Sequence, residues 1–398
     1  MNRRHFLHTT LAASAASCLR ADDVPPVKKL LGFAWHAPSV AVLAGGMEAL
    51  AEKTPWLDGV TFSLREKKPH QWAHLDAFSS EPWTEETLSF STLKTLRWRD
   101  PFRHNFVWMA AGPNYDTSAT HWFDDEAWRT VVKNARLLSR AVAESGARGI
   151  FLDTENYSGL WHYWNHHGLV AKEPKRICHY PGLTFAKVED KVRQRAAEWM
   201  DALQSTKPDI VVFASTLLSF GANLDSVETA YFPLLRAFTH GLIAAAAPGV
   251  VLVDGLENTY WTNDSTGFDW WRKRMRDSAA MLPAELRERW QRQSRTGMAV
   301  FFDGIIDSLH AAQLTADAAY RLRWLEHNIH HALTTNDEWT WLYMERRDPW
   351  QLGGGKAIAA EESAAIAKAR TTAATGKPAW HMKARTLDLS QPSDITPL

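Results

Sequence analysis

The sequence predicts a single (β/α)8 TIM barrel, and three observations indicate this fold class. Short apolar runs alternate with longer helical patterns from residue 30 onward, about eight such units fill the chain of 398 residues, and no glycine-rich phosphate loop follows the first predicted strand. Alternation of strands and helices implies a parallel sheet, and eight units in one chain imply that the sheet closes into a barrel. A doubly wound open sheet is the alternative, and the missing glycine-rich loop disfavours it.

Each predicted strand is a short apolar run, and each predicted helix is a longer segment in which apolar positions recur every 3.6 residues. The strands are expected at 30–36, 57–64, 104–111, 147–156, 210–217, 250–260, 297–306 and 338–345. The helices are expected at 40–53, 125–145, 184–205, 224–246, 268–291, 315–332 and 356–374, and the pattern is clearest at 184–205. Together these elements place the barrel at residues 25–375.

The two ends of the chain are expected to lie outside the barrel. Within residues 1–21, Arg3 and Arg4 precede Phe6 and Leu7 and an Ala/Ser-rich apolar run, which resembles a twin-arginine export signal. The resemblance implies a periplasmic or secreted protein. Cleavage before residue 22 and lipid anchoring at Cys18 are the two alternatives for processing. Residues 376–398, rich in Pro, Thr and Ser, are expected to form an irregular tail.

Composition excludes partners that bind by charge alone. The 45 Lys and Arg residues balance 45 Asp and Glu residues, so no bulk attraction to nucleic acid or to an anionic bilayer is expected. Beyond the export segment, no stretch is apolar for long enough to span a membrane. Tryptophan is unusually frequent, at 20 residues, and it suits both protein cores and sites that stack on flat ligand faces. No cofactor is predicted, because the sequence contains no Walker-type loop, nucleophile elbow or cysteine cluster.

Two carboxylates end the fourth predicted strand. In a barrel, functional side chains project from the C-terminal ends of the strands. Alternate residues of an extended chain share a face, so Phe151, Asp153 and Glu155 point the same way. Two carboxylates on the inward face repel each other, which raises one pKa and allows that group to act as a general acid. The alternative is that the pair caps the next element or forms salt bridges.

This Asp-x-Glu pattern at the end of strand four resembles the end of the signature of family 18 glycosidases. The resemblance implies that Glu155 protonates the leaving glycosidic oxygen and that Asp153 assists it. The match covers only this strand, since Phe151 and Arg148 stand where that family has further Asp residues. The wider resemblance is therefore to barrel glycosidases that carry an acid on strand four.

A second carboxylate is needed for acid/base catalysis, and two strand ends offer one. Asp254 and Glu257 have opposite parity, so a regular strand cannot direct both inward, although Gly255 permits a bulge. Glu257 is favoured because aromatic and amide residues follow it at once. Glu345, which shares its parity with the aromatic stripe of the last predicted strand, is the alternative base or nucleophile.

The predicted substrate-binding residues are aromatic, imidazole, amide or carboxyl side chains close to strand ends. Aromatic faces stack on pyranose rings, while imidazole, indole N–H and amide groups bond their hydroxyls. They are Trp35, His36, Tyr157, His162, Asn258, Tyr260, Trp261, Asp303 and Trp341.

The sequence therefore predicts an exported glycoside hydrolase that uses paired carboxylates on a poly- or oligosaccharide. One alternative is a barrel that binds glycans without cleaving them, in which the acids need not converge. The other is a metal-dependent hydrolase, for which His162 and His166 have helical spacing but lack acidic partners at HExxH-type positions. No set of metal ligands is predicted.

Overall fold

The structure is a computed structural model that describes residues 28–65, 75–112, 121–155, 159–164, 178–219, 228, 232–304 and 317–376. The predicted export segment, Cys18 and the expected tail from residue 377 onward lie outside these ranges. Within them, no helix is both long enough and apolar enough to cross a membrane.

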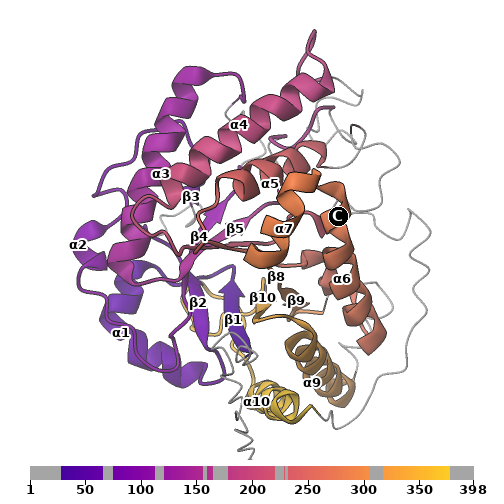
Figure 1. Ribbon diagram of the computed structural model, residues 1–398. Coiled ribbons are helices and arrows are strands. Elements are labelled where there is room, and N and C mark those ends of the chain that lie inside the picture. The colour runs from indigo at the N-terminus through magenta and orange to yellow at the C-terminus, as the bar shows by residue number, and fades with distance from the viewer. Residues whose placement is uncertain are drawn as a thin grey trace, which may run out of the picture.

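One sheet of ten parallel strands forms the centre of the molecule (Figure 1). Along the sheet the order is β8-β7-β6-β5-β4-β2-β1-β10-β9, with β3 paired to β4. The strands are β1 (Lys29–Ala34), β2 (Gly59–Phe62), β3 (Leu75–Asp76), β4 (Phe106–Ala110), β5 (Gly149–Asp153), β6 (Val211–Ala214), β7 (Val251–Asp254), β8 (Ser294–Thr296), β9 (Met298–Phe301) and β10 (Trp339–Met344).

The ten strands occupy the eight positions of a TIM barrel. Only Gly297 separates β8, which pairs with β7, from β9, which pairs with β10, so one stretch of chain joins the two ends of the sheet. The short β3 takes the place of β2 beside the later residues of β4. The predicted (β/α)8 barrel is thus confirmed, as a nearly closed parallel barrel.

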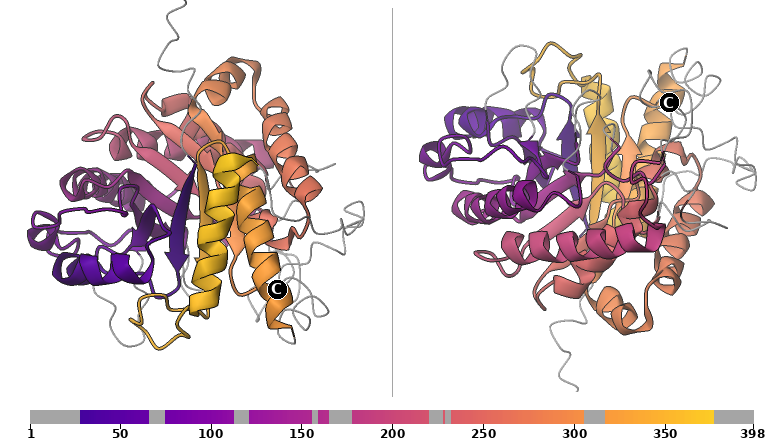
Figure 2. Two further views of the ribbon diagram at one scale, coloured as in Figure 1. Left: turned by 90° about the horizontal axis from the view of Figure 1, so that it is seen from below. Right: turned by 90° about the horizontal axis from the view of Figure 1, so that it is seen from above.

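Helices surround the strands, and α9 and α10 lie side by side (Figures 1 and 2). The helices are α1 (Val40–Lys53), α2 (Phe90–Leu93), α3 (Asp125–Ser145), α4 (Phe185–Leu203), α5 (Pro233–Ala245), α6 (Ser265–Asp277), α7 (Ala284–Gln293), α9 (Ala318–Thr335) and α10 (Ala360–Thr375), with 3₁₀ turns η4 (Glu257–Trp261) and η5 (Ser278–Met281). The predicted helices at 40–53 and 125–145 match α1 and α3 exactly in their bounds.

Two predicted elements are wrong in their extent. The segment 268–291 is not one helix: α6, η5 and α7 share it, and Pro283 precedes α7. Proline has no N–H to donate within a helix, and its ring clashes with the preceding turn, so one helix cannot continue through this position. The predicted strand at 250–260 stops at Asp254, because the chain turns through Leu256, whose φ of 49° is left-handed, into η4.

Most of the tryptophan excess is used for packing. Inside the barrel, aromatic side chains fill the space between strands; Phe33 stacks on Phe151 with ring centroids 4.5 Å apart. Outside it, Phe78 lies among four buried tryptophans near α3 and α4. Nine tryptophans of the described residues are fully buried: Trp122, Trp128, Trp161, Trp199, Trp290, Trp324, Trp339, Trp341 and Trp350.

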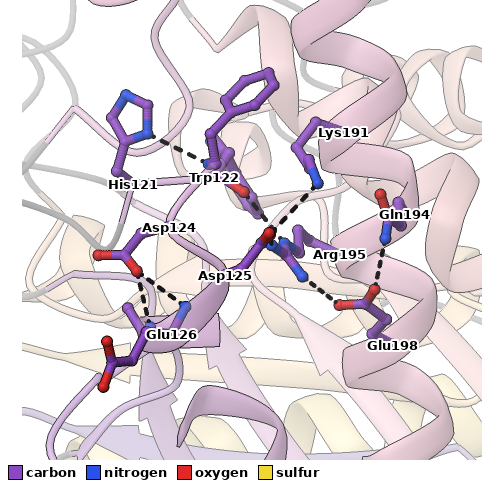
Figure 3. A network of polar contacts seen from close by, with 11 residues as sticks. His121, Trp122, Asp124, Asp125, Glu126, Lys191, Gln194, Arg195 and Glu198 are labelled. Carbon is purple, nitrogen blue, oxygen red and sulfur yellow. Dashed lines mark hydrogen bonds and ion pairs between the residues drawn. The ribbon is translucent and has the colours of Figure 1, made fainter. Parts of the chain in front are cut away.

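A polar network connects the start of α3 to α4 (Figure 3). The buried guanidinium of Arg195 pairs with Asp125 and with Glu198, and its Nε donates to the Trp122 carbonyl at 3.1 Å. The Asp124 side chain caps α3 by accepting the N–H groups of residues 126 and 127. This network lies beside the aromatic cluster, where Arg195 also packs over the Trp128 ring.

Candidate active site

Three carboxyl groups meet at the C-terminal end of the barrel. Asp153 is the last residue of β5, in the same parity as Phe151 in the barrel interior. Glu155 follows two residues later, and its N–H donates to Asp153 Oδ1 at 3.0 Å. Glu257 is the first residue of η4, directly after the turn that ends β7. All three residues are half-buried.

The three carboxyl groups lie close enough for the charges of Glu155 and Asp153 to act on Glu257. Burial and the Glu155 carboxylate raise the pKa of Asp153 well above its usual value, while the hydrogen bond from the Glu155 N–H partly opposes this effect. Burial, followed by the charges of Glu155 and Asp153, raises the pKa of Glu257 well above its usual value. A hydrogen bond from Ser215 partly opposes that increase. The site therefore favours carboxyl groups that keep protons beyond the pH at which isolated ones lose them.

The turn after β7 decides which of its two acids reaches the site. Asp254, of opposite parity to a strand-borne Glu257, is fully buried and accepts the Ser219 N–H at 2.9 Å and the Ser219 hydroxyl at 2.7 Å. It also accepts the Leu256 N–H at 3.3 Å, which holds the left-handed turn. Asp254 thus supports the loop, and Glu257 faces the other carboxylates.

Two tyrosines lie beside the carboxyl groups. The rings of Tyr260 and Tyr343 are stacked, with centroids 5.8 Å apart and an interplanar angle of 15°. Phe301 stacks on Tyr343 at 5.3 Å. Burial raises the pKa of both phenols, and so do the charges of Glu257, Glu155 and Asp153, so both hydroxyls stay protonated. Tyr343 is not among the predicted binding residues, although it shares the parity of Glu345.

Glu345 lies apart from the three converging carboxyl groups. Its side chain is exposed. Its charge raises the pKa of Tyr343, whereas burial and other carboxyl groups raise the pKa values of Asp153 and Glu257. Asp303 Oδ2 accepts the backbone N–H groups of Glu345 and Arg346, both at 2.9 Å, so Asp303 holds the end of β10. The geometry therefore favours Glu257 over Glu345 as the second carboxyl.

Of the remaining predicted residues, four are half-buried near strand ends. Trp35 packs edge-on against Trp108 at 6.2 Å. His36 contacts Gly353, where an added Cβ would lie 1.9 Å from the imidazole Nδ1. Asn258 and Trp261 belong to η4 beside Glu257. Their predicted roles in binding stay predictions. Tyr157 and His166 lie outside the described residues.

Burial contradicts one predicted binding residue and weakens the case for another. Trp341 is 1% exposed inside the barrel, and its indole N–H donates to the Gly255 carbonyl at 2.8 Å, so it has no free face for a sugar. His162 is 2% exposed and stacks near Phe232, with ring centroids 5.8 Å apart. The sequence pattern misses this distinction because parity does not report depth in a barrel.

No metal centre is found in the part of the chain that the structure describes: no group of three or more His, Cys, Asp or Glu side chains there could hold a metal ion.

Comparisons with known proteins show likeness in fold. No protein-family model matches the chain, and no curated protein does. Three similar solved structures are glycoside hydrolases. A GH5_18 protein from Streptomyces cattleya in complex with GlcNAc has 12% identity and a TM-score of 0.49, covering 89% of this chain and 82% of that one. A GH5-4 broad specificity endoglucanase from an uncultured bacterium has 9% identity and a TM-score of 0.43, covering 81% and 84%. A GH18 chitinase from Pseudoalteromonas aurantia has 10% identity and a TM-score of 0.41, covering 86% and 100%.

Proposed function

We propose that this chain is a glycoside hydrolase that cleaves O-glycosidic bonds of an oligo- or polysaccharide. The observation that carries the proposal is the convergence of Asp153, Glu155 and Glu257 at the C-terminal end of the barrel, with two of their pKa values raised. Hydrolysis of a glycosidic bond needs one carboxyl that holds a proton and one that acts on the opposite face of the sugar. Carboxyl groups that lie close together and have raised pKa values meet the first need, because the group keeps a proton that isolated carboxyls would lose.

In the proposed reaction, Glu155 donates its proton to the glycosidic oxygen as the bond to the anomeric carbon breaks. Asp153, which accepts the Glu155 N–H, shares the proton of the pair and orients its partner. Glu257 supplies the second carboxyl. It either attacks the anomeric carbon to form a glycosyl ester, which water activated by Glu155 then hydrolyses with net retention at a carboxyl separation of about 5 Å, or it activates water for direct attack at roughly 6.5–9.5 Å, which inverts the configuration.

Neutral hydroxyls and aromatic faces would bind the sugar. Tyr260 and Tyr343 keep their phenolic protons, and so they can donate hydrogen bonds to sugar oxygens. The half-buried Trp35, directly after β1, offers an indole for stacking on a pyranose ring. The twin-arginine pattern of residues 3–7 supports the further proposal that the enzyme is exported.

The test is a screen of the purified protein against a panel of polysaccharides, with Glu155→Gln and Glu345→Gln assayed alongside. Glu155→Gln should lower turnover by about 10²–10⁴-fold, because the amide has no acidic proton to transfer to the leaving oxygen. The exposed Glu345 lies outside the converging group, so Glu345→Gln should keep turnover within about threefold. Near-normal turnover by Glu155→Gln would refute the assignment. Binding of a glycan without cleavage would favour the non-catalytic alternative.

A further inference from the structure

Two buried hydroxyls connect the end of β5 to Glu257. Thr154 lies between Asp153 and Glu155, directly after β5, and Ser215 directly follows β6; the two residues are 0% and 1% exposed. Their oxygens, Thr154 Oγ1 and Ser215 Oγ, are 2.9 Å apart. Ser215 Oγ also accepts the Thr154 N–H at 3.1 Å, and Thr154 Oγ1 lies 2.9 Å from the Thr216 carbonyl oxygen. The pair is therefore held by backbone groups at both ends.

Ser215 contacts Glu257 through both its main chain and its side chain. The Glu257 N–H donates to the Ser215 carbonyl at 3.0 Å, and the Glu257 carboxyl accepts a hydrogen bond from the Ser215 side chain. The hydrogen bond from this hydroxyl lowers the pKa of Glu257, against the effects of burial and of the neighbouring acids. A continuous path thus runs from the Thr216 carbonyl through Thr154 and Ser215 to the Glu257 carboxyl.

We propose that Thr154 and Ser215 form a reversible hydroxyl relay that keeps Glu257 hydrogen-bonded in both of its protonation states. When Glu257 is ionised, Thr154 donates to Ser215, and Ser215 donates to the carboxylate. When Glu257 is protonated, it donates to Ser215, Ser215 donates to Thr154, and Thr154 donates to the Thr216 carbonyl. Each hydroxyl rotates and keeps its own proton, so no proton enters or leaves the pair.

Such a relay would give the Glu257 carboxyl a hydrogen-bond partner in both protonation states. A buried polar atom left without a partner costs about 1–3 kcal/mol. Backbone N–H groups can only donate, so they favour a carboxylate and cannot accept the O–H of a carboxylic acid; a hydroxyl both donates and accepts. The inference rests on the proposed function, in which Glu257 is the second carboxyl and, when it activates water as a base, takes up a proton in each cycle. Thr154 and Ser215 are positioning residues in this scheme, since they act through Glu257.

Ser215 is the hydrogen-bonding side chain that acts on the pKa of Glu257, and the titratable groups around it act through their charge or their burial. The titratable side chains that face it are Asp153 and Glu155 from the end of β5, Tyr260 from η4 and Tyr343 from β10. Burial and the charge of Glu257 keep both phenols protonated. The two acids carry charge of the same sign as Glu257, so they raise its pKa rather than support its ionised form.

The relay is tested by titrating the carboxyl carbon of Glu257 by NMR in protein labelled with ¹³C-glutamate, the signal being assigned by its loss in Glu257→Gln. Ser215→Ala should raise the pKa of Glu257 by about one unit, because the carboxylate loses its donor. Thr154→Val should lower it, because Ser215 loses its acceptor when Glu257 is protonated. Ser215→Thr, which keeps a hydroxyl, should return the value to within about 0.3 units of the wild type.

Ser139→Ala is the matched control, because Ser139 is an equally buried hydroxyl that accepts the Thr206 N–H, away from the turn after β7. It should leave the pKa of Glu257 unchanged. Equal shifts in all three deletion variants, or no shift in Ser215→Ala, would overturn the relay. The titration needs no substrate. A relay that behaves as expected in a protein that cleaves no glycan would therefore refute the proposed function and leave the relay standing.

Discussion

At the residue scale, the site depends on carboxyl groups placed against their ordinary preference for water. Asp153 and Glu257 both have raised pKa values, and in each case burial is the largest cause. Groups held in this way usually lower stability and are characteristic of functional sites. The variants that test them should therefore separate activity from stability.

The second carboxyl can be identified by chemical rescue. Glu257→Ala should lower turnover by about 10²–10⁴-fold, and added azide should restore part of it by taking the place of the lost carboxylate. The configuration of the azide or water product, read by proton NMR, would distinguish a nucleophile from a base. Glu345→Ala, at the exposed end of β10, should keep most of its activity. Rescue of Glu345→Ala in place of Glu257→Ala would reverse the assignment.

Asp76 is a further carboxyl at the C-terminal end of a barrel strand, and it is not among the residues predicted from the sequence. It ends β3 in register with Ala110, which is in register with Asp153, so the three residues lie on one face. Burial raises its pKa to about 6, against hydrogen bonds from the N–H groups of Phe78 and Gly112. The stability that its protonated form contributes is complete below the unfolded pKa near 4, and it is lost as the pH rises through about 6.

Asp76→Asn should therefore stabilise the fold only where the wild-type carboxyl is charged. We expect its free energy of unfolding to exceed that of the wild type by about 1–3 kcal/mol at pH 8, and to match it at pH 4. Urea unfolding at the two pH values measures the difference. Wild-type and variant stabilities that change in parallel from pH 4 to pH 8 would show that Asp76 keeps an ordinary pKa.

At the element scale, ion pairs and a helix cap connect α9 and α10 to the segments that follow β9 and β10. Glu362, in the first turn of α10, accepts the Ala359 N–H at 3.0 Å and pairs with Arg321 of α9 and Arg347 after β10. Its carboxyl is buried, with a side chain 6% exposed. These bonds lower the pKa of Glu362 although burial opposes them. Arg321 also donates to the Phe302 carbonyl, next to Asp303.

Glu362→Ala should be strongly destabilising, because it leaves two half-buried guanidinium groups without their shared partner. A loss of about 3–5 kcal/mol is expected, as for other broken buried ion pairs. Glu361→Ala, at the exposed neighbouring position, is the matched control and should change stability by less than about 0.5 kcal/mol. Thermal unfolding of the two variants provides the comparison, and similar melting temperatures would contradict the proposed role of Glu362.

The glycines of the loop between β10 and α10 also help to position neighbouring elements. The run Gly353–Gly355 reads in the sequence as a flexible entry to the final helix. In the structure, the Gly353 N–H donates to Asp348 Oδ2 at 2.6 Å, and its missing side chain leaves room for the imidazole of His36. This segment therefore brings the last loop against the end of β1.

At the scale of the whole molecule, the barrel closes through a single glycine. A Cβ added to Gly297 would lie 3.0 Å from the Gly255 Cα and 3.2 Å from the Asp254 carbonyl oxygen. The Gly297 N–H donates to that carbonyl at 2.8 Å. The closure therefore contacts the turn that directs Glu257 into the site.

Gly297→Ala should weaken the fold and the site together. Both contacts are with backbone, which cannot move cheaply, so a loss of about 1–3 kcal/mol and a fall in turnover are expected. Gly45→Ala is the control: no atom lies within 4 Å of its added Cβ, and a helical Ala stabilises by up to about 1 kcal/mol. Unfolding by urea and the rate of glycan cleavage are the measurements. Wild-type turnover in Gly297→Ala would show that the backbone contacts of Gly297 do not affect the candidate active site.

Much of the fold could be predicted because its signals are local. Apolar spacing located α1 and α3 to the residue and placed a strand at each of the eight barrel positions, but it missed β3 and β8, continued a helix through Pro283 and continued a strand past Leu256. The site was only partly predictable. Small hydroxyls such as Thr154 and Ser215 show no pattern in sequence, and the two-residue β3 becomes a strand only by pairing with β4.

The sequence by itself determined the order of strands and helices and the shared face of Asp153 and Glu155, because both follow from the geometry of neighbouring residues. Only the tertiary structure decided that Glu257, rather than Glu345, lies with that pair, and that Trp341 is a core residue. The reason is physical. Parity states which face a side chain takes, whereas depth in the barrel and the meeting of separate strand ends depend on how the sheet closes.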